Sequence, residues 1–112
     1  MAIAVGATRQ ILADAYTGSG SWFSIHTATP GSTGASEASG GSYARKQTTW
    51  GTGSAGVTAG SQMTFDLNSG TYTHTGMWTA VTAGTFRDGC AMTSTVLSVA
   101  GQILVTPTIT IT

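Results

Sequence analysis

The last twelve residues of the chain, 101–112, constrain the fold more than any other segment. Aliphatic residues or proline occupy every second position from 103 to 111, and the positions between them are mostly threonine. This period of two is typical of a β-strand with one buried face. The segment carries no charge, so its strand edge needs cover from the subunit or from a partner. Pro107 cannot donate a hydrogen bond to a neighbouring strand, which predicts an edge or a bulge there.

Strand patterns recur along the rest of the chain after residue 21. Residues 62–67 alternate between apolar side chains (Met63, Phe65 and Leu67) and polar ones. Turn signals at short, regular spacing indicate a sandwich or a small barrel. We therefore predict a mainly β fold, a small antiparallel β-sandwich or barrel of about six or seven strands. The expected strands are 22–27, 42–50, 62–67, 71–79, 85–93, 94–99 and 103–112, with loops at 31–42 and 51–60.

One segment near the N-terminus has helical periodicity. Over residues 3–17 the apolar side chains follow helical spacing, with Arg9, Gln10 and Asp14 on the other side. Gly18 supplies a stop signal. We expect one short helix over 3–17, docked on the sheet. The alternative that the helix is an arm gripping a neighbouring subunit stays open.

Composition restricts the classes of partner. The chain has 112 residues, which fits a single β-rich domain over 1–112. Charged residues make up 7% and the net charge is zero, which argues against nucleic-acid binding. No apolar run approaches the roughly 20 residues of a membrane-spanning helix, so no membrane partner is expected. A near-neutral protein tends to associate, and we expect neighbouring copies of the chain to cover much of its surface as a homo-oligomer.

Side chains that could perform chemistry are few and scattered. His26 and His74 have no carboxylate or cysteine at a metal-ligand spacing, and both read as structural. Cys90 is the only cysteine and has no evident base partner, so we expect a half-buried structural thiol. Asp66 and Asp88 are a weak case for a carboxylate pair. We predict no catalytic, cofactor-binding or metal-binding residues, and therefore no enzymatic activity.

A charged and aromatic segment between residues 37 and 50 is the best candidate for a contact surface. Arg45 and Lys46 are adjacent, so in a strand their side chains point to opposite faces. One of them could pair with an acidic patch on a neighbouring subunit and fix the register of the contact. The alternative is exposure to solvent. The candidate interface residues are Glu37, Tyr43, Arg45, Lys46 and Trp50.

The three tryptophans leave two readings open. Trp22, Trp50 and Trp78 lie in or beside expected strands. Core packing is the ordinary role of such side chains. An exposed ring could instead stack on a sugar or fill a pocket on a partner.

Four segments, in this order, resemble a family of small virion proteins of tailed phages. They are SIHTATPG at 24–31, GASEASGGSYAR at 34–45, THTGMW at 73–78 and VAGQIL at 99–104, with a closing Ile111-Thr112. The resemblance covers nearly the whole chain. The family pattern often has an acid where this chain has Thr29. Members are described as head-decoration, minor tail or tail-fibre proteins, so the resemblance implies a virion structural protein without catalytic residues.

Two locations in the virion follow from this resemblance. The first is the capsid surface, where the chain would act as a decoration or cement protein bound to the major capsid protein and to its own copies. Contact energy summed over many copies would then reinforce the shell. The alternative is a minor tail, tail-fibre or tail-tip protein that contacts glycans on the host surface. A cell-wall hydrolase is a third, disfavoured reading, because the four acids are dispersed.

Overall fold

The computed structural model describes residues 2–112 and confirms a mainly β, antiparallel fold. Over these residues one N-terminal helix precedes eight strands, slightly more than the six or seven expected. The elements are α1 (Gly6–Gly18), β1 (Trp22–His26), β2 (Lys46–Gln47), β3 (Val57–Ala59), β4 (Met63–Leu67), β5 (Gly70–Trp78), β6 (Phe86–Leu97), β7 (Gly101–Val105) and β8 (Thr108–Thr110).

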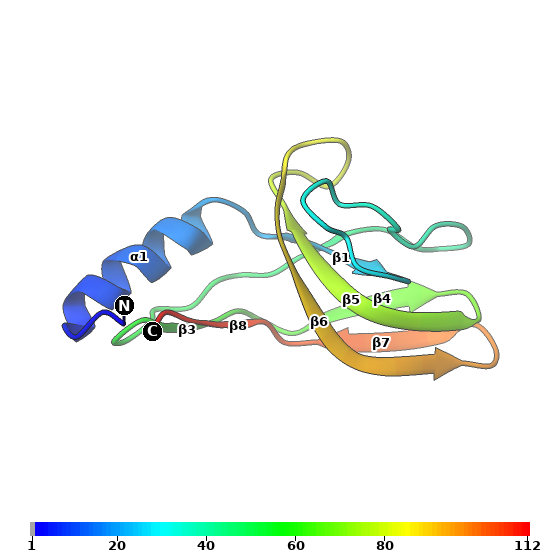
Figure 1. Cartoon of the computed structure of the whole chain (residues 1–112). Helices are drawn as coiled ribbons and strands as arrows, with labels where there is room; N and C mark the ends of the chain where they lie inside the picture. Colours follow the sequence, from blue (N-terminus) through cyan, green and yellow to red (C-terminus); the bar gives the residue numbers. More distant parts are fainter. Residues whose placement is uncertain (1) are drawn as a thin grey trace.

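The strands form three small sheets (Figure 1). The largest has the order β2-β1-β5-β6, and the other two are the two-stranded ribbons β4-β7 and β3-β8. Within the described residues these sheets do not close into a barrel. Consequently β6 is an edge strand of the large sheet, and each ribbon strand has one unpaired edge.

The core lies where the large sheet meets the β4-β7 ribbon. The predicted alternation of β4 is confirmed, because Met63, Phe65 and Leu67 are buried. They pack in one cluster with side chains of β1, β5 and β7, among them Ile25 and Ile103. Full burial of each large apolar side chain stabilises the fold by about 1.5–3 kcal/mol. This cluster supplies the rigid body from which the loops project.

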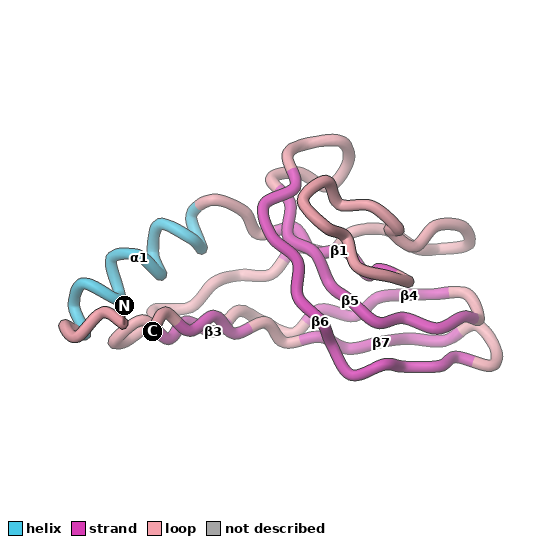
Figure 2. The backbone as a smooth tube through the Cα atoms, in the orientation of Figure 1, coloured by secondary structure: helices cyan, strands magenta, loops and turns pink. Residues whose placement is uncertain are grey.

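The remaining elements form an arm that extends from this body (Figures 1 and 2). The arm consists of α1 and the β3-β8 ribbon, and the C-terminus lies beside the start of α1 at its tip. The molecule is therefore elongated, with extents of 46 × 25 × 25 Å. The expected docking of the helix on a sheet takes the form of contact mainly with this ribbon, while Tyr16 near the end of α1 packs against the core cluster.

The helix begins later than the sequence pattern predicted. It starts at Gly6, whereas the expected range began at residue 3. Val5 has extended backbone angles and makes no side-chain capping hydrogen bond. The guanidinium of Arg9 instead hydrogen-bonds the carbonyl of Ile3, which holds the preceding residues outside the helix.

Several strand boundaries also need correction. The expected strand 42–50 is reduced to β2, and the expected loop 51–60 contains β3. The expected strands 85–93 and 94–99 are one continuous strand, β6. These differences share a cause: β3 and β6 are strands because of pairing with β8 and β5, segments distant in sequence or separated by a turn.

The expected single strand over 103–112, with an edge or a bulge at Pro107, needs correction. The proline interrupts the C-terminal strand and separates β7 from β8. The two halves then pair with different partners, β7 with β4 and β8 with β3. The alternating burial predicted for residues 103–111 continues across the break. One C-terminal segment therefore joins the body to the arm.

Candidate functional site

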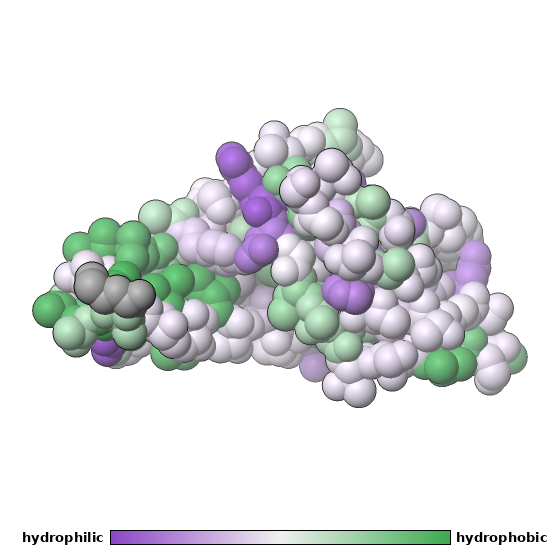
Figure 3. All heavy atoms as spheres, viewed as in Figure 1, coloured by the Kyte–Doolittle hydropathy of each residue, from purple (hydrophilic) through white to green (hydrophobic). Residues whose placement is uncertain are grey.

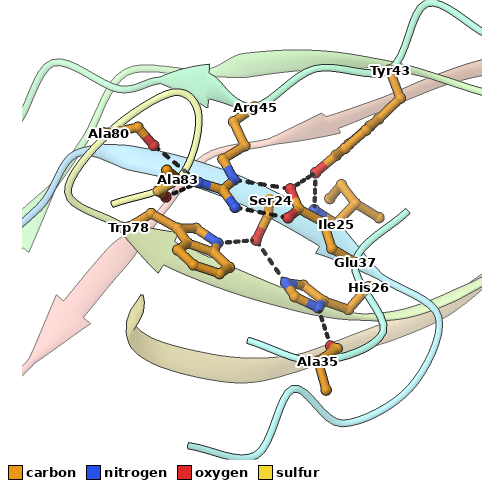
Figure 4. A network of polar contacts seen from close by, with 10 residues as sticks. All are labelled: Ser24, Ile25, His26, Ala35, Glu37, Tyr43, Arg45, Trp78, Ala80 and Ala83. Atoms are coloured by element: carbon orange, nitrogen blue, oxygen red, sulfur yellow. Dashed lines mark hydrogen bonds and ion pairs between the residues drawn. The ribbon is translucent and has the colours of Figure 1, made fainter. Parts of the chain in front are cut away.

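Arg45 is the centre of a polar network on the large sheet (Figure 4). Its guanidinium makes two parallel hydrogen bonds to the Glu37 carboxylate, Nε to Oε2 and Nη2 to Oε1, both at 2.9 Å. Its Nη1 also donates to the carbonyls of Ala80, at 3.1 Å, and Ala83, at 2.8 Å. The guanidinium carbon lies 3.6 Å from the centre of the Trp78 ring. All three nitrogens and one face of this guanidinium are thus engaged inside one subunit.

Tyr43 extends the network toward β1. Its hydroxyl donates to Oε2 of Glu37 at 2.7 Å and accepts the backbone N–H of Ile25 at 3.2 Å. The backbone of Glu37 also forms an isolated bridge with His26 at the end of β1. Glu37, Tyr43 and Arg45, three of the five candidate interface residues, therefore meet in space and bind one another.

A second chain of hydrogen bonds runs beneath Trp78. The Trp78 indole Nε1 donates to the Ser24 hydroxyl at 2.8 Å, and the Ser24 oxygen lies 2.6 Å from Nε2 of His26. The other ring nitrogen of His26, Nδ1, is 2.7 Å from the Ala35 carbonyl, which can only accept. Nδ1 therefore carries the proton, and Nε2 accepts the hydrogen of Ser24. The bonds fix a neutral histidine in one tautomer.

Burial and hydrogen bonding shift the pKa values of these groups. Burial lowers the pKa of His26, and this effect outweighs the hydrogen bond to Ala35. Burial by itself raises the pKa of the Glu37 carboxyl, but the hydrogen bonds and charge of Arg45, together with the Tyr43 hydroxyl, leave it below its usual value. Burial and the bond to Glu37 raise the pKa of Tyr43. At neutral pH the network therefore holds an ionised Glu37 and a neutral His26.

A hydrogen-bonded serine and histidine could form a nucleophile and its base, but the surroundings of this pair indicate a structural role. Ser24 and His26 are both fully buried, and neither lines the grooves of this surface. The Ser24 oxygen also accepts the Trp78 indole, and the histidine is bound to a backbone carbonyl. The two chains of bonds together tie loop 27–45 and turn 79–85 to β1 and β5.

The neutral His26 predicts that stability falls in mild acid. Because the folded pKa lies below the unfolded value of 6.5, the unfolded chain binds the extra proton first as pH falls below 6.5. The free energy of unfolding should therefore decrease from pH 7.5 to pH 5.5, by at most about 1.4 kcal/mol per pH unit for one proton. Urea denaturation at the two pH values measures this.

The matched variants are His26→Gln and His74→Gln. The first should be less stable at pH 7.5 but lose the dependence between pH 7.5 and 5.5, whereas the second should keep it. Glu37 does not contribute to this pH dependence. Because its pKa is lowered in the folded chain, its ionised form stabilises the fold, and this stabilisation is lost only as the pH falls below about 4.5. An unchanged pH dependence in His26→Gln contradicts the assignment.

The other two candidate interface residues lie apart from this network. Lys46 is half-buried in β2, opposite Phe23 of β1. Trp50 packs edge-on against Phe23 at 5.9 Å between ring centres, and its Nε1 donates to the Gly20 carbonyl at 2.9 Å. Trp50 therefore belongs partly to the core and partly to the groove described next.

An apolar groove of about 540 Å³ opens beside Trp50. Tyr16, Phe23 and Trp50 line it together with two stretches of strand, one from β6 and one from β7 to β8. The side chains are mostly apolar or threonine, and none of them is formally charged. Such a surface favours an apolar or neutral partner over an ionic ligand.

The remaining sequence candidates are distributed as follows. Trp78 is buried and Trp22 is half-buried, so core packing describes Trp78 best. Cys90 is exposed, which corrects the expected half-buried thiol; the reason is that β6 is an edge strand. Among residues 2–112, no three His, Cys, Asp or Glu side chains gather closely enough to hold a metal ion. None of the helices described is long and apolar enough to cross a membrane.

Sequence reasoning missed the parts of Ser24 and Trp78 in the network. Ser24 and His26 alternate on β1 and therefore share a face, which was a local signal for their bond. Trp78 is 54 positions from Ser24, and no local pattern links them. The segment 34–45, which carried part of the family resemblance, supplies Glu37, Tyr43 and Arg45.

Comparison with known proteins gives one match. Residues 10–112 match the family described as Podophage GP4 fiber I protein gp80. No curated protein and no solved structure matches the chain. The matched region includes the whole polar network and the groove, and only the first nine residues lie outside it.

Proposed function

The chain belongs to the podophage fiber I protein family, and from this premise we propose that it is a structural subunit of a tail fibre that works in an assembly with copies of itself. Membership of this family makes the chain a virion structural protein and confirms the resemblance to small tailed-phage virion proteins. Of the two locations expected from the sequence, the word fiber in the family description favours the tail over the capsid surface. The proposed role is mechanical and does not require chemistry.

The observation that carries this proposal is the free edge of β6. This strand spans twelve residues, pairs with β5 on one side only and is largely exposed. After Asp88 it carries no charged residue and no proline. Solitary proteins usually protect such an edge with charges, proline or a covering loop, because it otherwise pairs with other chains. A subunit whose neighbours cover β6 in the virion needs no such protection.

The test is the number and place of copies in purified virions. Quantitative mass spectrometry against the major capsid protein should give far fewer copies of this chain than of the capsid protein. Gold-labelled antibody should bind at the tail. A copy number close to that of the capsid protein, with label over the head, would instead identify a decoration protein bound to the major capsid protein and would overturn the proposal.

Contact with host-surface glycans is a second candidate, favoured by one observation. The ring of Trp50 lines the apolar groove beside Tyr16 and Phe23, and aromatic rings are suitable surfaces for stacking on sugars. Binding of the purified protein to a glycan array tests it. Leu104→Glu changes the groove at an exposed residue outside the core and should abolish binding, whereas Val99→Glu in the β6-β7 turn should not. Binding that survives Leu104→Glu, or no binding at all, rejects this candidate.

A further inference from the structure

Helix α1 is oriented with its polar side toward its own subunit. Gln10 donates to the Thr58 hydroxyl at 3.2 Å and accepts the N–H of Gly56 at 3.0 Å. Arg9 donates from Nε to the Ala55 carbonyl at 3.1 Å. The only buried residue of the helix is the small Ala13. The helix thus rests on the β3-β8 ribbon through these polar contacts and the methyl group of Ala13. Near its C-terminal end, Tyr16 also packs against the core cluster and donates from its hydroxyl to Asp88 at 2.7 Å.

The apolar side of α1 consequently faces away from the subunit. Ile11 is 67% exposed and Leu12 is 43% exposed. Thr8 and Ala15 are exposed beside them. Figure 3 shows apolar side chains gathered at the arm end of the molecule, where α1 lies. In an ordinary amphipathic helix the apolar stripe faces the core, so this reversed orientation indicates a surface that another molecule covers.

The spacing of this outward stripe suits pairing with another helix. Thr8, Ile11 and Ala15 are separated by three and four residues, the core positions of a heptad repeat, and Leu12 flanks them. Ala13 occupies the opposite side of the helix, against the ribbon. We call Thr8, Ile11, Leu12 and Ala15 the outer seam. At about 20 Å in length, α1 offers roughly two heptads for such a contact.

We propose that the outer seam is a contact between copies of this chain, helix against helix. In a symmetric assembly the same patch comes from every copy, so a charged residue in it would meet a like charge. The outer seam contains no charged residue and is therefore compatible with itself. This inference rests on the proposal that the chain works in an assembly of several copies, and it assigns one of the contact surfaces.

A lipid surface is a poorer occupant of the seam. Helices that lie on membranes carry several lysines or arginines on the polar side. The only basic residue of α1 is Arg9, and its guanidinium is engaged by the carbonyls of Ala55 and Ile3. A single helix face is also small beside the roughly 1,200–2,000 Å² of a stable interface. The association should therefore depend on concentration and add to other contacts between copies.

Sedimentation equilibrium of the full chain over a series of concentrations tests the proposal. The wild type should self-associate, and Ile11→Asp should raise the dissociation constant by at least about tenfold, equivalent to about 1.4 kcal/mol. Val99→Asp is the matched control, because Val99 is an aliphatic residue with a similar exposure of 72% at the opposite end of the molecule. The Val99→Asp variant should have a dissociation constant within about twofold of the wild-type value. A monomeric wild type, or an Ile11→Asp variant that associates normally, overturns the proposal.

A cross-linking experiment gives a positive signal that does not depend on weakened association. In a Cys90→Ser background, Ile11→Cys should form covalent dimers with a short bis-maleimide, whereas Val99→Cys should remain monomeric. Equal cross-linking of the two variants contradicts a seam at α1. Failure here leaves the fibre assignment intact, since that assignment is decided by the place of the chain in the virion.

Discussion

Replacing Arg45 with methionine should lower the free energy of unfolding by about 3–5 kcal/mol. The Arg45 side chain is 9% exposed, and its partner Glu37 is 22% exposed. Methionine keeps an apolar side chain against Trp78 but removes all the donors of Arg45. The two backbone carbonyls lose this partner, and the Glu37 carboxylate loses its opposite charge and keeps only the Tyr43 hydroxyl as a donor. An unpaired charge in such a place is far more costly than the loss of a surface ion pair. Urea denaturation followed by tryptophan fluorescence measures the change.

The control for this substitution is Arg87→Met. Arg87 is exposed and donates only from Nε to the Ser19 carbonyl, so its loss should cost less than about 1 kcal/mol. Glu37→Gln combined with Arg45→Met should cost less than the sum of the two single changes, because neither then leaves a buried charge. Equal effects of Arg45→Met and Arg87→Met would show that the network contributes no more than a surface contact.

Replacing Gly34 with alanine should cost about 2–5 kcal/mol, from an overpacking contribution and a backbone contribution. Gly34 has φ +78°, a left-handed conformation that alanine adopts only with strain. A Cβ atom there would lie 2.5 Å from Cη2 of Trp78 and 3.1 Å from Cδ1 of Phe86. The indole cannot move freely, because Arg45 stacks on it and Ser24 accepts its N–H. Loop 27–45 approaches the sheet closely at this glycine.

Gly31→Ala separates the two contributions. Gly31 lies in the same loop with φ +59°, but a Cβ atom there meets nothing within 4 Å. Its substitution should cost only the backbone strain, about 1–2 kcal/mol, offset in part by the reduced entropy of the unfolded chain. The difference between the two variants in the same denaturation experiment reports the contact with Trp78. Similar losses of stability in both variants would mean that Trp78 moves aside for the added methyl group with no loss of stability.

These two predictions concern the same feature of the molecule, a long loop held in one conformation. Loop 27–45 contains few apolar residues and could not order itself by burial. The Glu37–Arg45 pair joins two parts of the loop, and the His26–Ala35 bond fixes the loop to the sheet. If either substitution loosens the loop without unfolding the core, the body of the protein should remain while its surface changes shape.

Local patterns in the sequence were sufficient for the class of the fold. The alternation of Met63, Phe65 and Leu67 correctly identified the core face of β4, whereas at Pro107 the C-terminal strand breaks, where an edge or a bulge was expected. Side-chain periodicity and the missing N–H of proline act within a few residues, so their effects can be predicted without knowing which strand pairs with which. Strand boundaries at β3 and β6 were missed because pairing with other segments defines them.

Three residues of the polar network could be selected from the sequence, but their arrangement could not. Glu37, Tyr43 and Arg45 were selected from the sequence as surfaces for a neighbouring subunit, and in the fold they bind one another. Eight residues separate Glu37 from Arg45, a spacing that no helix or strand period brings together. Their meeting depends on the path of the loop between them, and on turn 79–85, which supplies two further carbonyls.

The sequence by itself determined that this chain is a neutral, mainly β protein with one amphipathic helix and a family resemblance to phage virion proteins. Tertiary structure alone decided which side of that helix faces inward. Periodicity places Arg9 and Gln10 opposite Ile11, but it does not say which side finds a partner. The peptide groups of Ala55 and Gly56, just before β3, bind the polar side, and Ile11 and Leu12 remain outside. The physical reason is that burial depends on the surface an element meets, and distant segments of the chain supply that surface.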